Sequence, residues 1–358
     1  MKITDYRLQI EKHTRMKRNW IAILFSITII AFLLDIAIGS VKIPINEIVK
    51  IIFGSKSDNL AWQNIIQQIR IPKACTAVLA GSALSVAGLL MQTLFRNPMA
   101  GPDVLGLTSG ASLGVALVML ASGSVGSITL IKQLGPLGSW MTVIAASLGS
   151  SLILLIVLGI SLKIKNNVTL LIIGIMIGTL TISVVSLLLF FSSPDQVQEY
   201  LTWTFGSIGG VTGTHLFTLL VFVLIGLFLS LLSTKSLNML LLGENYARAM
   251  GLSVIKSRIL IIAATSLLAG SITAFCGPIS FIGLAVPHLC KAMLNTSDHL
   301  PLAISSCLVG SIIMLICDII VHSAVDQAVL PINVVTAFVG APVVIWVIIR
   351  NKNAKPSF

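Results

Sequence analysis

Two basic residues, Arg70 and Lys73, stand on either side of Ile-Pro at the start of a long apolar run, and a Pro- and Gly-rich turn ends that run. The turn, residues 92–106, reads Gln-Thr-Leu-Phe-Arg-Asn-Pro-Met-Ala-Gly-Pro-Asp-Val-Leu-Gly. Such a break is tolerated at membrane depth only where protein buries the freed backbone groups or water reaches them. The pattern therefore predicts part of a transport pathway. The residues that form it are Gln92, Arg96, Asn97, Pro98, Gly101, Pro102 and Gly106.

A second candidate segment, residues 242–254, reads Leu-Gly-Glu-Asn-Tyr-Ala-Arg-Ala-Met-Gly-Leu-Ser-Val and lies between two long apolar runs. Its small side chains permit close approach to another surface, and its two glycines stand where short helices are often capped. One interpretation is an amphipathic connecting loop, and the other is a short helix that inserts into a groove on a partner. The candidate residues are Gly243, Glu244, Ala247, Arg248, Ala249 and Gly251.

Ionisable residues in or beside apolar runs are the remaining candidates, because charge inside a membrane usually has a function. Asp103 and Asp318 either relay protons or stabilise helix ends, and for Asp103 we favour helix capping. His288 has no second histidine or cysteine at ligand spacing, so we expect no metal site. The sequence also contains no P-loop, nucleophile elbow or catalytic carboxylate pair. We therefore expect a transport subunit that does not itself hydrolyse ATP.

Composition sets the class of protein that must position these residues. Of 358 residues, 56% are hydrophobic and 10% are charged, and the mean hydropathy is +1.02. Soluble domains carry about 25% charged residues. We therefore expect an all-α polytopic membrane protein with a single domain, residues 1–358. The net charge of +11 lies in the loops, which favours a membrane topology signal over nucleic-acid binding.

Ten apolar runs are candidates to cross the bilayer at about 1.5 Å per helical residue. They are residues 19–39, 74–95, 104–122, 139–161, 168–191, 214–233, 258–276, 281–296, 302–321 and 333–350. With the N-terminus inside, seventeen lysines and arginines fall in inner segments and six in outer segments. This asymmetry predicts that both termini are cytoplasmic, together with residues 1–18 and 235–256.

Two connections and one repeated pattern complete the predicted organisation. Residues 41–68 are amphipathic and predict a helix at the outer interface, whereas the polar, Gly-rich residues 192–212 predict a short broken helix. Residues 101–106 and 277–283 each begin with Gly-Pro and precede a short apolar run. This similarity indicates either two five-span halves related as a repeat or a chance match in a Gly-rich chain.

Together, these motifs resemble those of the FecCD family of ABC-transporter permeases, which import iron-siderophores, haem and vitamin B12. The resemblance extends over nearly the whole chain, and it implies a type II ABC importer permease architecture with about ten transmembrane helices. It rests on residues 70–73, 92–106, 242–251, 277–288, Asp318 and residues 330–342.

The resemblance also implies roles. In this family, the short helix between spans six and seven docks on an ATP-binding subunit, and here that helix is roughly residues 243–252. Outward-facing basic residues grip acidic residues of a substrate-binding protein, and the matching positions are Arg70, Lys73 and His322. Close relatives carry Arg at the third position. Because His is mostly neutral at pH 7, docking is expected to be weaker, more pH-sensitive or adapted to a different partner surface.

The implied assembly contains two copies of this chain, two cytoplasmic ATP-binding subunits and one extracytoplasmic binding protein in the cytoplasmic (inner) membrane. This chain would hold no cofactor, since ATP and Mg²⁺ would bind the ATPase subunits. The expected cargo is an iron-siderophore-type chelate, with vitamin B12 or haem as alternatives. Residues 330–346 resemble the vitamin B12 branch, although Asn333 replaces a typical Gly. An ion-coupled secondary transporter that uses Asp318 or Asp103 is the alternative from another class.

Overall fold

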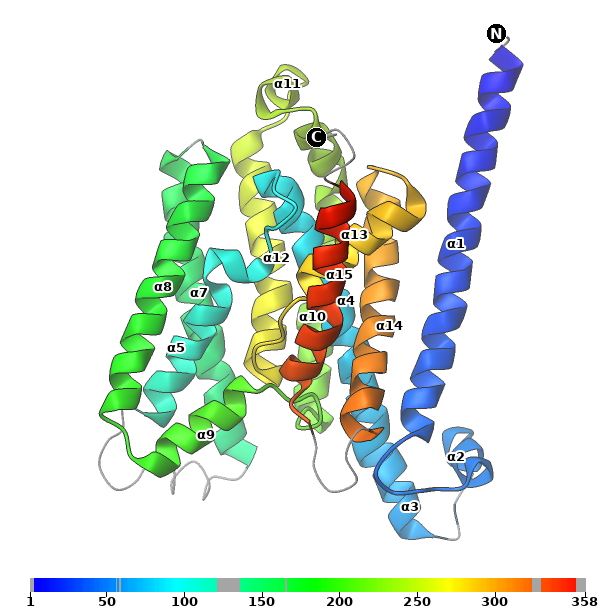
Figure 1. Ribbon diagram of the computed structural model, residues 1–358, viewed down its shortest axis with the longest axis vertical. Coiled ribbons are helices and arrows are strands. Elements are labelled where there is room, and N and C mark those ends of the chain that lie inside the picture. The colour runs from blue at the N-terminus through cyan, green and yellow to red at the C-terminus, as the bar shows by residue number, and fades with distance from the viewer. Residues whose placement is uncertain are drawn as a thin grey trace.

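The computed structural model describes residues 3–55, 57, 59–120, 136–164, 166–323 and 330–351, and within these ranges every regular element is a helix (Figure 1). The π-helix η1 precedes α4, and the 3₁₀ helix η2 precedes α5. The elements are α1 (Ile3–Ala37), α2 (Ile45–Ile52), α3 (Leu60–Asn64), η1 (Ile65–Arg70), α4 (Ile71–Phe95), η2 (Pro102–Leu105), α5 (Leu107–Met119), α7 (Pro136–Lys163), α8 (Asn167–Phe190), α9 (Pro194–Thr204), α10 (Gly213–Leu241), α11 (Glu244–Ala249), α12 (Val254–Cys276), α13 (Ile282–Leu294), α14 (His299–Ser323) and α15 (Ile332–Asn351).

Seven helical segments among the described residues are long and apolar enough to cross a membrane. Three further apolar helices are shorter and cover Leu107–Met119, Ile282–Leu294 and Ile332–Trp346. The outer faces of the long helices are apolar; on α8, for example, Ile172, Met176 and Leu180 are all exposed. The all-α polytopic architecture is therefore confirmed, while the number of ten spans stays a prediction.

The connections lie at two opposite ends of the molecule. α11 lies at the end where α1 begins and α15 finishes, whereas α2, α3 and α9 lie at the other end (Figure 1). This is the arrangement that the predicted topology requires, with residues 41–68 and 192–212 on the side opposite the termini. In the predicted interfacial segment, α2 buries Ile48 and Ile51. In the second, a capping box of Ser193 and Gln196 begins α9.

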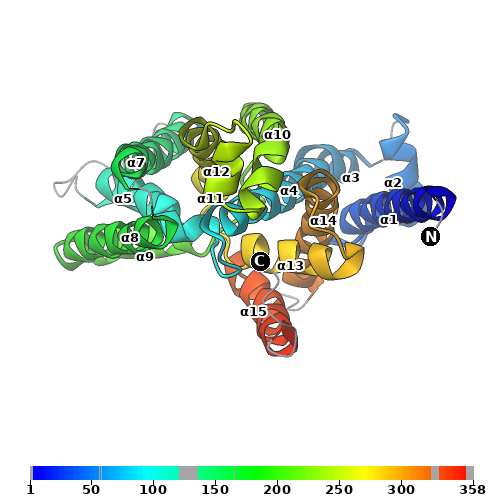
Figure 2. The same ribbon diagram turned by 90° about the horizontal axis from the view of Figure 1, so that it is seen from above.

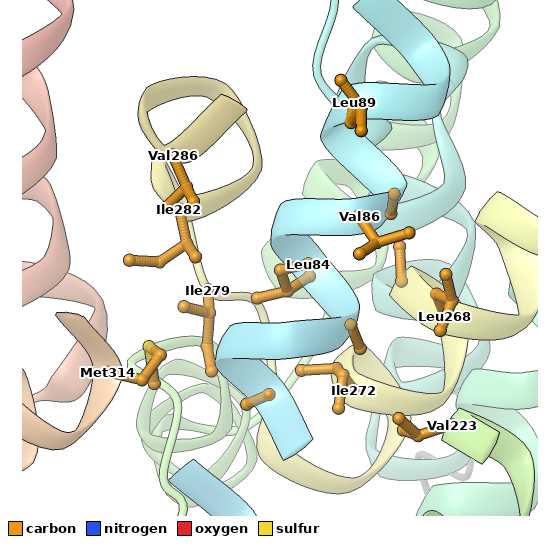
Figure 3. Close-up of a cluster of buried hydrophobic side chains, with 14 of the residues drawn as sticks. Leu84, Val86, Leu89, Val223, Leu268, Ile272, Ile279, Ile282, Val286 and Met314 are labelled. Atoms are coloured by element: carbon orange, nitrogen blue, oxygen red, sulfur yellow. The ribbon is translucent and has the colours of Figure 1, made fainter. Parts of the chain in front are cut away.

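α4 is the central helix, and nearly all its side chains are buried. Seen from above, α10 and α12 lie on one side of it and α13 and α14 on the other (Figure 2). In the core, Leu84 of α4 points toward Ile279 and Ile282, while Val86 points toward Leu268 of α12 (Figure 3). Most of its residues are apolar or small, and its polar side chains, such as Ser85 and Gln92, are buried among the neighbouring helices.

Glycines bring α4 and its neighbours to backbone contact. A Cβ built on Gly81 would lie 2.2 Å from the carbonyl oxygen of Gly310 on α14, and one built on Gly310 would lie 2.2 Å from that of Gly81. At Gly88, a Cβ would lie 1.6 Å from the carbonyl oxygen of Gly283 on α13. Only glycine permits these approaches, and small residues are the usual means of close helix packing in membranes.

A second tightly packed pair is α5 and α7. A Cβ on Gly110 would lie 2.7 Å from the carbonyl oxygen of Gly149, and one on Gly114 would lie 1.9 Å from that of Ala145. The two backbones are therefore in contact over more than one helical turn. This contact joins α7 firmly to the helix that follows the first Gly-Pro break.

Candidate functional site

Arg70 lies at the end of η1, is only 4% exposed, and points into the protein. Its Nη1 donates hydrogen bonds to the carbonyl oxygens of Ile36 (2.8 Å) and Ala37 (3.1 Å), and its Nη2 donates to that of Val41. The last carbonyls of a helix lack intrahelical donors, and a cation near them is favoured by the helix dipole. Gly39 leaves the necessary space, since a Cβ there would lie 2.8 Å from Cζ of Arg70. Arg70 therefore holds the C-terminal end of α1 in place.

Lys73, on the first turn of α4, forms an ion pair with Asp318 of α14. Lys73 Nζ lies 2.8 Å from Asp318 Oδ2, and the two side chains are 8% and 1% exposed. His322 Nε2 lies 3.6 Å from Asp318 Oδ1, one helical turn further along α14. The three residues predicted to dock a binding protein thus lie together and all have partners within the chain, and Lys73 and His322 share Asp318.

Asp35 of α1 is a member of this group that the sequence did not single out. It is 1% exposed and lies beside Asp318. Lys73 and Arg70 are close enough for their charges to act on its carboxyl group. The sequence feature that could have identified Asp35 is that it is the single carboxylate in the apolar run 19–39. We call Asp35, Arg70, Lys73, Asp318 and His322 the Asp318 cluster.

The first break begins where Arg96 adopts a left-handed conformation (φ 49°, ψ 37°) and ends α4. The backbone N–H of Asn97 then donates to the carbonyl oxygen of Gln92 at 3.1 Å. Oδ1 of Asn97 accepts a hydrogen bond from the N–H of Met99 at 2.9 Å. The chain turns further at Gly106 (φ 75°), which packs against the backbone of α8 before α5 begins.

α13 stabilises this turn from the side. His288 Nε2 donates to the carbonyl oxygen of Pro98 at 2.7 Å, and Nε2 of Gln92 donates to that of Leu284 at 3.1 Å. His288 therefore stabilises the backbone of the turn at Pro98. Asp103 does not have the predicted capping role. Gly101 occupies the N-cap position of η2, and the Asp103 carboxylate accepts a hydrogen bond from the Thr108 hydroxyl instead.

The second break faces the first. Gly277 (φ 75°) ends α12, and Phe281 in the left-handed region (φ 69°) begins α13. Both breaks precede a helix of 13 residues. They line a common cavity of about 230 Å³ together with α4, and its lining residues are Leu84, Gly101, Pro102, Asp103, Ile279, Ser280, Phe281, Gly283 and Leu284. The two similar Gly-Pro segments of the sequence thus meet in space.

At the opposite end from the Asp318 cluster, α11 is a helix between two glycines that adopt positive φ, Gly243 (114°) and Gly251 (86°). Ala247 is fully buried against the rest of the chain. Three large apolar side chains nearby are exposed: Leu242 (63%), Tyr246 (60%) and Met250 (44%). Exposed apolar groups of this kind at the end of a molecule indicate an interaction surface.

Three arginines contact α11 or the end of the helix that precedes it. Arg96, predicted for the pathway, directs Nη2 to the carbonyl oxygens of Leu240 (2.9 Å) and Leu241 (2.7 Å) at the end of α10. Arg258 of α12 forms an ion pair with Glu244 at 3.0 Å. Arg248 lies 3.7 Å from the same carboxylate. Arg258 was counted in the sequence only as an inner-side cation, and its contact with Glu244 was missed.

Comparisons with known proteins agree with this geometry. The sequence pattern of the FecCD transport family matches residues 27–350. The vitamin B12 import system permease protein BtuC of Citrobacter koseri is 31% identical over 341 residues, which cover 94% of this chain and 97% of that protein. BtuC of Klebsiella pneumoniae subsp. pneumoniae is 32% identical over 339 residues, with coverages of 94% and 96%.

A solved structure, described as an inward-facing conformation of an ABC transporter of the metal-chelate type, superposes with a TM-score of 0.80 and 26% sequence identity. The match covers 93% of this chain and 99% of that one. A secondary transporter is therefore the wrong class. The chain belongs to the FecCD transport family and is the membrane permease subunit of an ABC importer whose ATPase is a separate subunit.

Proposed function

We propose that two copies of this chain form the pathway of an importer that moves an iron-siderophore-type chelate across the cytoplasmic membrane by alternating access. Two ATP-binding subunits would bind at the cytoplasmic end, where α11 and both termini would lie. One binding protein would deliver the chelate at the outer end. The cavity between the two Gly-Pro breaks lies beside the proposed pathway. Support comes from family membership and from the metal-chelate type of the structural neighbour.

The exposed surface of α11 is the observation that carries the proposal. Leu242, Tyr246 and Met250 offer an apolar face to a groove, which is a common mode of helix recognition. The glycines on both sides permit the helix to tilt when the ATPase subunits close. Ala249 is exposed on α11, so a large charged side chain there would meet the partner.

Binding and uptake assays on the purified complex test the cargo. Labelled ferric hydroxamate, cyanocobalamin and haem are presented to vesicles that contain the permease, its ATPase and its binding protein. ATP-dependent uptake of ferric hydroxamate alone is the expected result. Uptake that persists without nucleotide and follows a proton gradient, or normal uptake by Ala249→Glu, would refute the proposed mechanism.

Vitamin B12 is the second candidate, because the two relatives named above are B12 permeases. Asn333 argues for a different cargo. Its Oδ1 accepts a hydrogen bond from the N–H of Ser280 at 3.1 Å, and Ser280 lines the cavity between the breaks. A glycine at this position would leave that N–H without its partner. Saturable cyanocobalamin uptake in the same assay would favour the second candidate.

At the outer end, we propose that Arg70, Lys73 and His322 take part in docking the binding protein. Their internal contacts imply that docking carboxylates compete with Asp318 for Lys73 and His322. The expected result is weaker binding of the binding protein to Lys73→Gln than to a variant at the exposed Lys42. Equal affinities would contradict this role.

A further inference from the structure

From the second turn of α12, Arg258 contacts both the end of α7 and the start of α11, and its side chain is only 6% exposed. Its Nη1 donates to the carbonyl oxygens of Ser161 (3.1 Å) and Ile164 (2.9 Å), where α7 ends. Its Nη2 donates to Glu244 Oε1 at 3.0 Å, on the first residue of α11. In Figure 1, α12 lies between α7 and α10, and α11 sits above it.

The chemistry of these contacts requires an arginine. The last carbonyls of α7 have no intrahelical donors and carry the negative end of the helix dipole, so a buried cation is stabilised there. The planar guanidinium presents separate N–H groups to the carbonyls of α7 and to the carboxylate of Glu244. A lysine has a single nitrogen and would not span both positions. Arg258 therefore joins α7 and α11 through one side chain.

Glu244 is the point at which α11 is held. Gly243 and Gly251, both with positive φ, stand at the two ends of this helix. Arg248 also lies near Glu244, but at 3.7 Å and with its side chain 47% exposed, so solvent screens that pair. The charge-assisted hydrogen bond from buried Arg258 is the stronger restraint.

α7 in turn is joined to the pathway. Its backbone contacts α5 at Gly110 and Gly114, as described above. α5 follows the break that lines the cavity at Gly101 and Pro102. A displacement of α11 that pulls on Arg258 is thus applied to a rigid pair of helices that leads to the breaks.

We propose that Arg258 is a positioning residue that couples movement of α11 to the α5–α7 pair. The inference rests on the proposed docking of α11 with the ATPase and adds the route by which docking acts on the pathway. It predicts that α11 and α7 move together when nucleotide binds. Without Arg258, α11 would still bind the ATPase but would move independently of α7.

Spin labels test the joint movement. The five native cysteines are replaced, and nitroxides are placed at the exposed Asn245 on α11, outside the proposed docking face, and at Ile156 on α7. The short distance within one subunit is measured in the complex without nucleotide and after trapping with ATP and vanadate. In the parent, this distance is expected to stay constant, and in Arg258→Gln it is expected to broaden and to change on trapping. A constant distance in the variant would overturn the proposal.

ATP hydrolysis supplies the second readout. The binding protein is expected to stimulate hydrolysis by the parent complex, and Arg258→Gln is expected to reduce that stimulation about tenfold, a typical size for coupling between sites. Arg258→Lys restores the positive charge without the planar guanidinium, and stimulation of ATP hydrolysis should stay low in this variant. Lys256→Gln is the matched control, since it removes the same charge from an exposed position on α12. Its stimulation should equal that of the parent.

A double variant separates coupling from simple capping of α7. If Arg258 acts through Glu244, then Glu244→Gln combined with Arg258→Gln should lose no more stimulation than Arg258→Gln alone. Additive losses would overturn the proposal. Co-purification of the ATPase distinguishes failure of the Arg258 coupling from failure of α11 docking. Arg258→Gln should retain the ATPase, whereas failure of the parent to retain it would refute the docking of α11 itself.

Discussion

Removal of Lys73 is expected to destabilise the permease strongly, because it leaves a buried carboxylate without its ionic partner. Asp318 is 1% exposed, its other neighbour His322 carries charge only when protonated, and Asp35 lies beside it. The Arg70 guanidinium is already engaged by three backbone carbonyls. Breaking a buried ion pair from one side costs about 3–5 kcal/mol. We expect a loss of this size for Lys73→Met.

The double variant Lys73→Met with Asp318→Leu tests the cause. Replacing both charges by apolar groups of similar size is often neutral or stabilising, so the double variant should recover to within about 1 kcal/mol of the parent. The recovered energy is the coupling of the pair in a double-mutant cycle. Lys42→Met, at an exposed position on the same side, is the control and should change stability by less than about 0.5 kcal/mol.

Reversible unfolding by SDS in mixed micelles measures these free energies. The reasoning would be refuted if Lys73→Met lost less than about 1 kcal/mol, or if the double variant were as unstable as the single one. The same proteins separate stability from docking. A double variant that folds normally but binds the binding protein weakly would support docking through Lys73.

Three further predictions concern packing, backbone conformation and pH. Gly88→Ala should prevent stable folding, because its Cβ would lie 1.6 Å from a carbonyl oxygen of α13, whereas Gly159→Ala, with no atom within 4 Å, should express and melt like the parent. Gly243→Ala should reduce ATP hydrolysis in the complex by forcing φ 114° on a residue with a Cβ at a cost of about 1–3 kcal/mol, and Gly210→Ala should not. Hydrogen bonds from a lysine and a serine lower the pKa of Glu47 in α2, so its contribution to stability is present above the ordinary value of 4.5 and is lost as pH falls. Melting curves of the parent and Glu47→Gln should therefore differ at pH 7 and converge in acid.

The architecture was predictable because long apolar runs and Gly-Pro breaks have few structural solutions in a bilayer. Residues 74–95 and 258–276 became α4 and α12 with small shifts at their ends. The limits of α1 were less predictable. It begins at Ile3 instead of near residue 19, since a polar segment can continue a helix out of the membrane without any sequence signal for a stop.

The direction of side chains was the part that could not be predicted. Arg70 and Lys73 carry charges that in isolation favour water, and only the positions of α1 and α14 explain why both are buried. Arg96 was assigned to the pathway from its place in the turn, yet its guanidinium reaches the end of α10. A long basic side chain can contact a helix that is distant in the sequence. The periodicity of apolar residues therefore predicts where the backbone of such a residue lies but not which group its side chain contacts.

The contact between Gly81 and Gly310 has a consequence for how this fold can be recognised in other sequences. Each residue excludes any larger side chain at the other, and no amino acid is smaller than glycine, so neither position can compensate for change at its partner. Pairs of positions that change together reveal spatial contacts, but a pair that cannot change carries no such signal. We therefore expect the closest approach of α4 and α14 to be invisible to covariation, and to be found only as two unvarying glycines far apart in the chain.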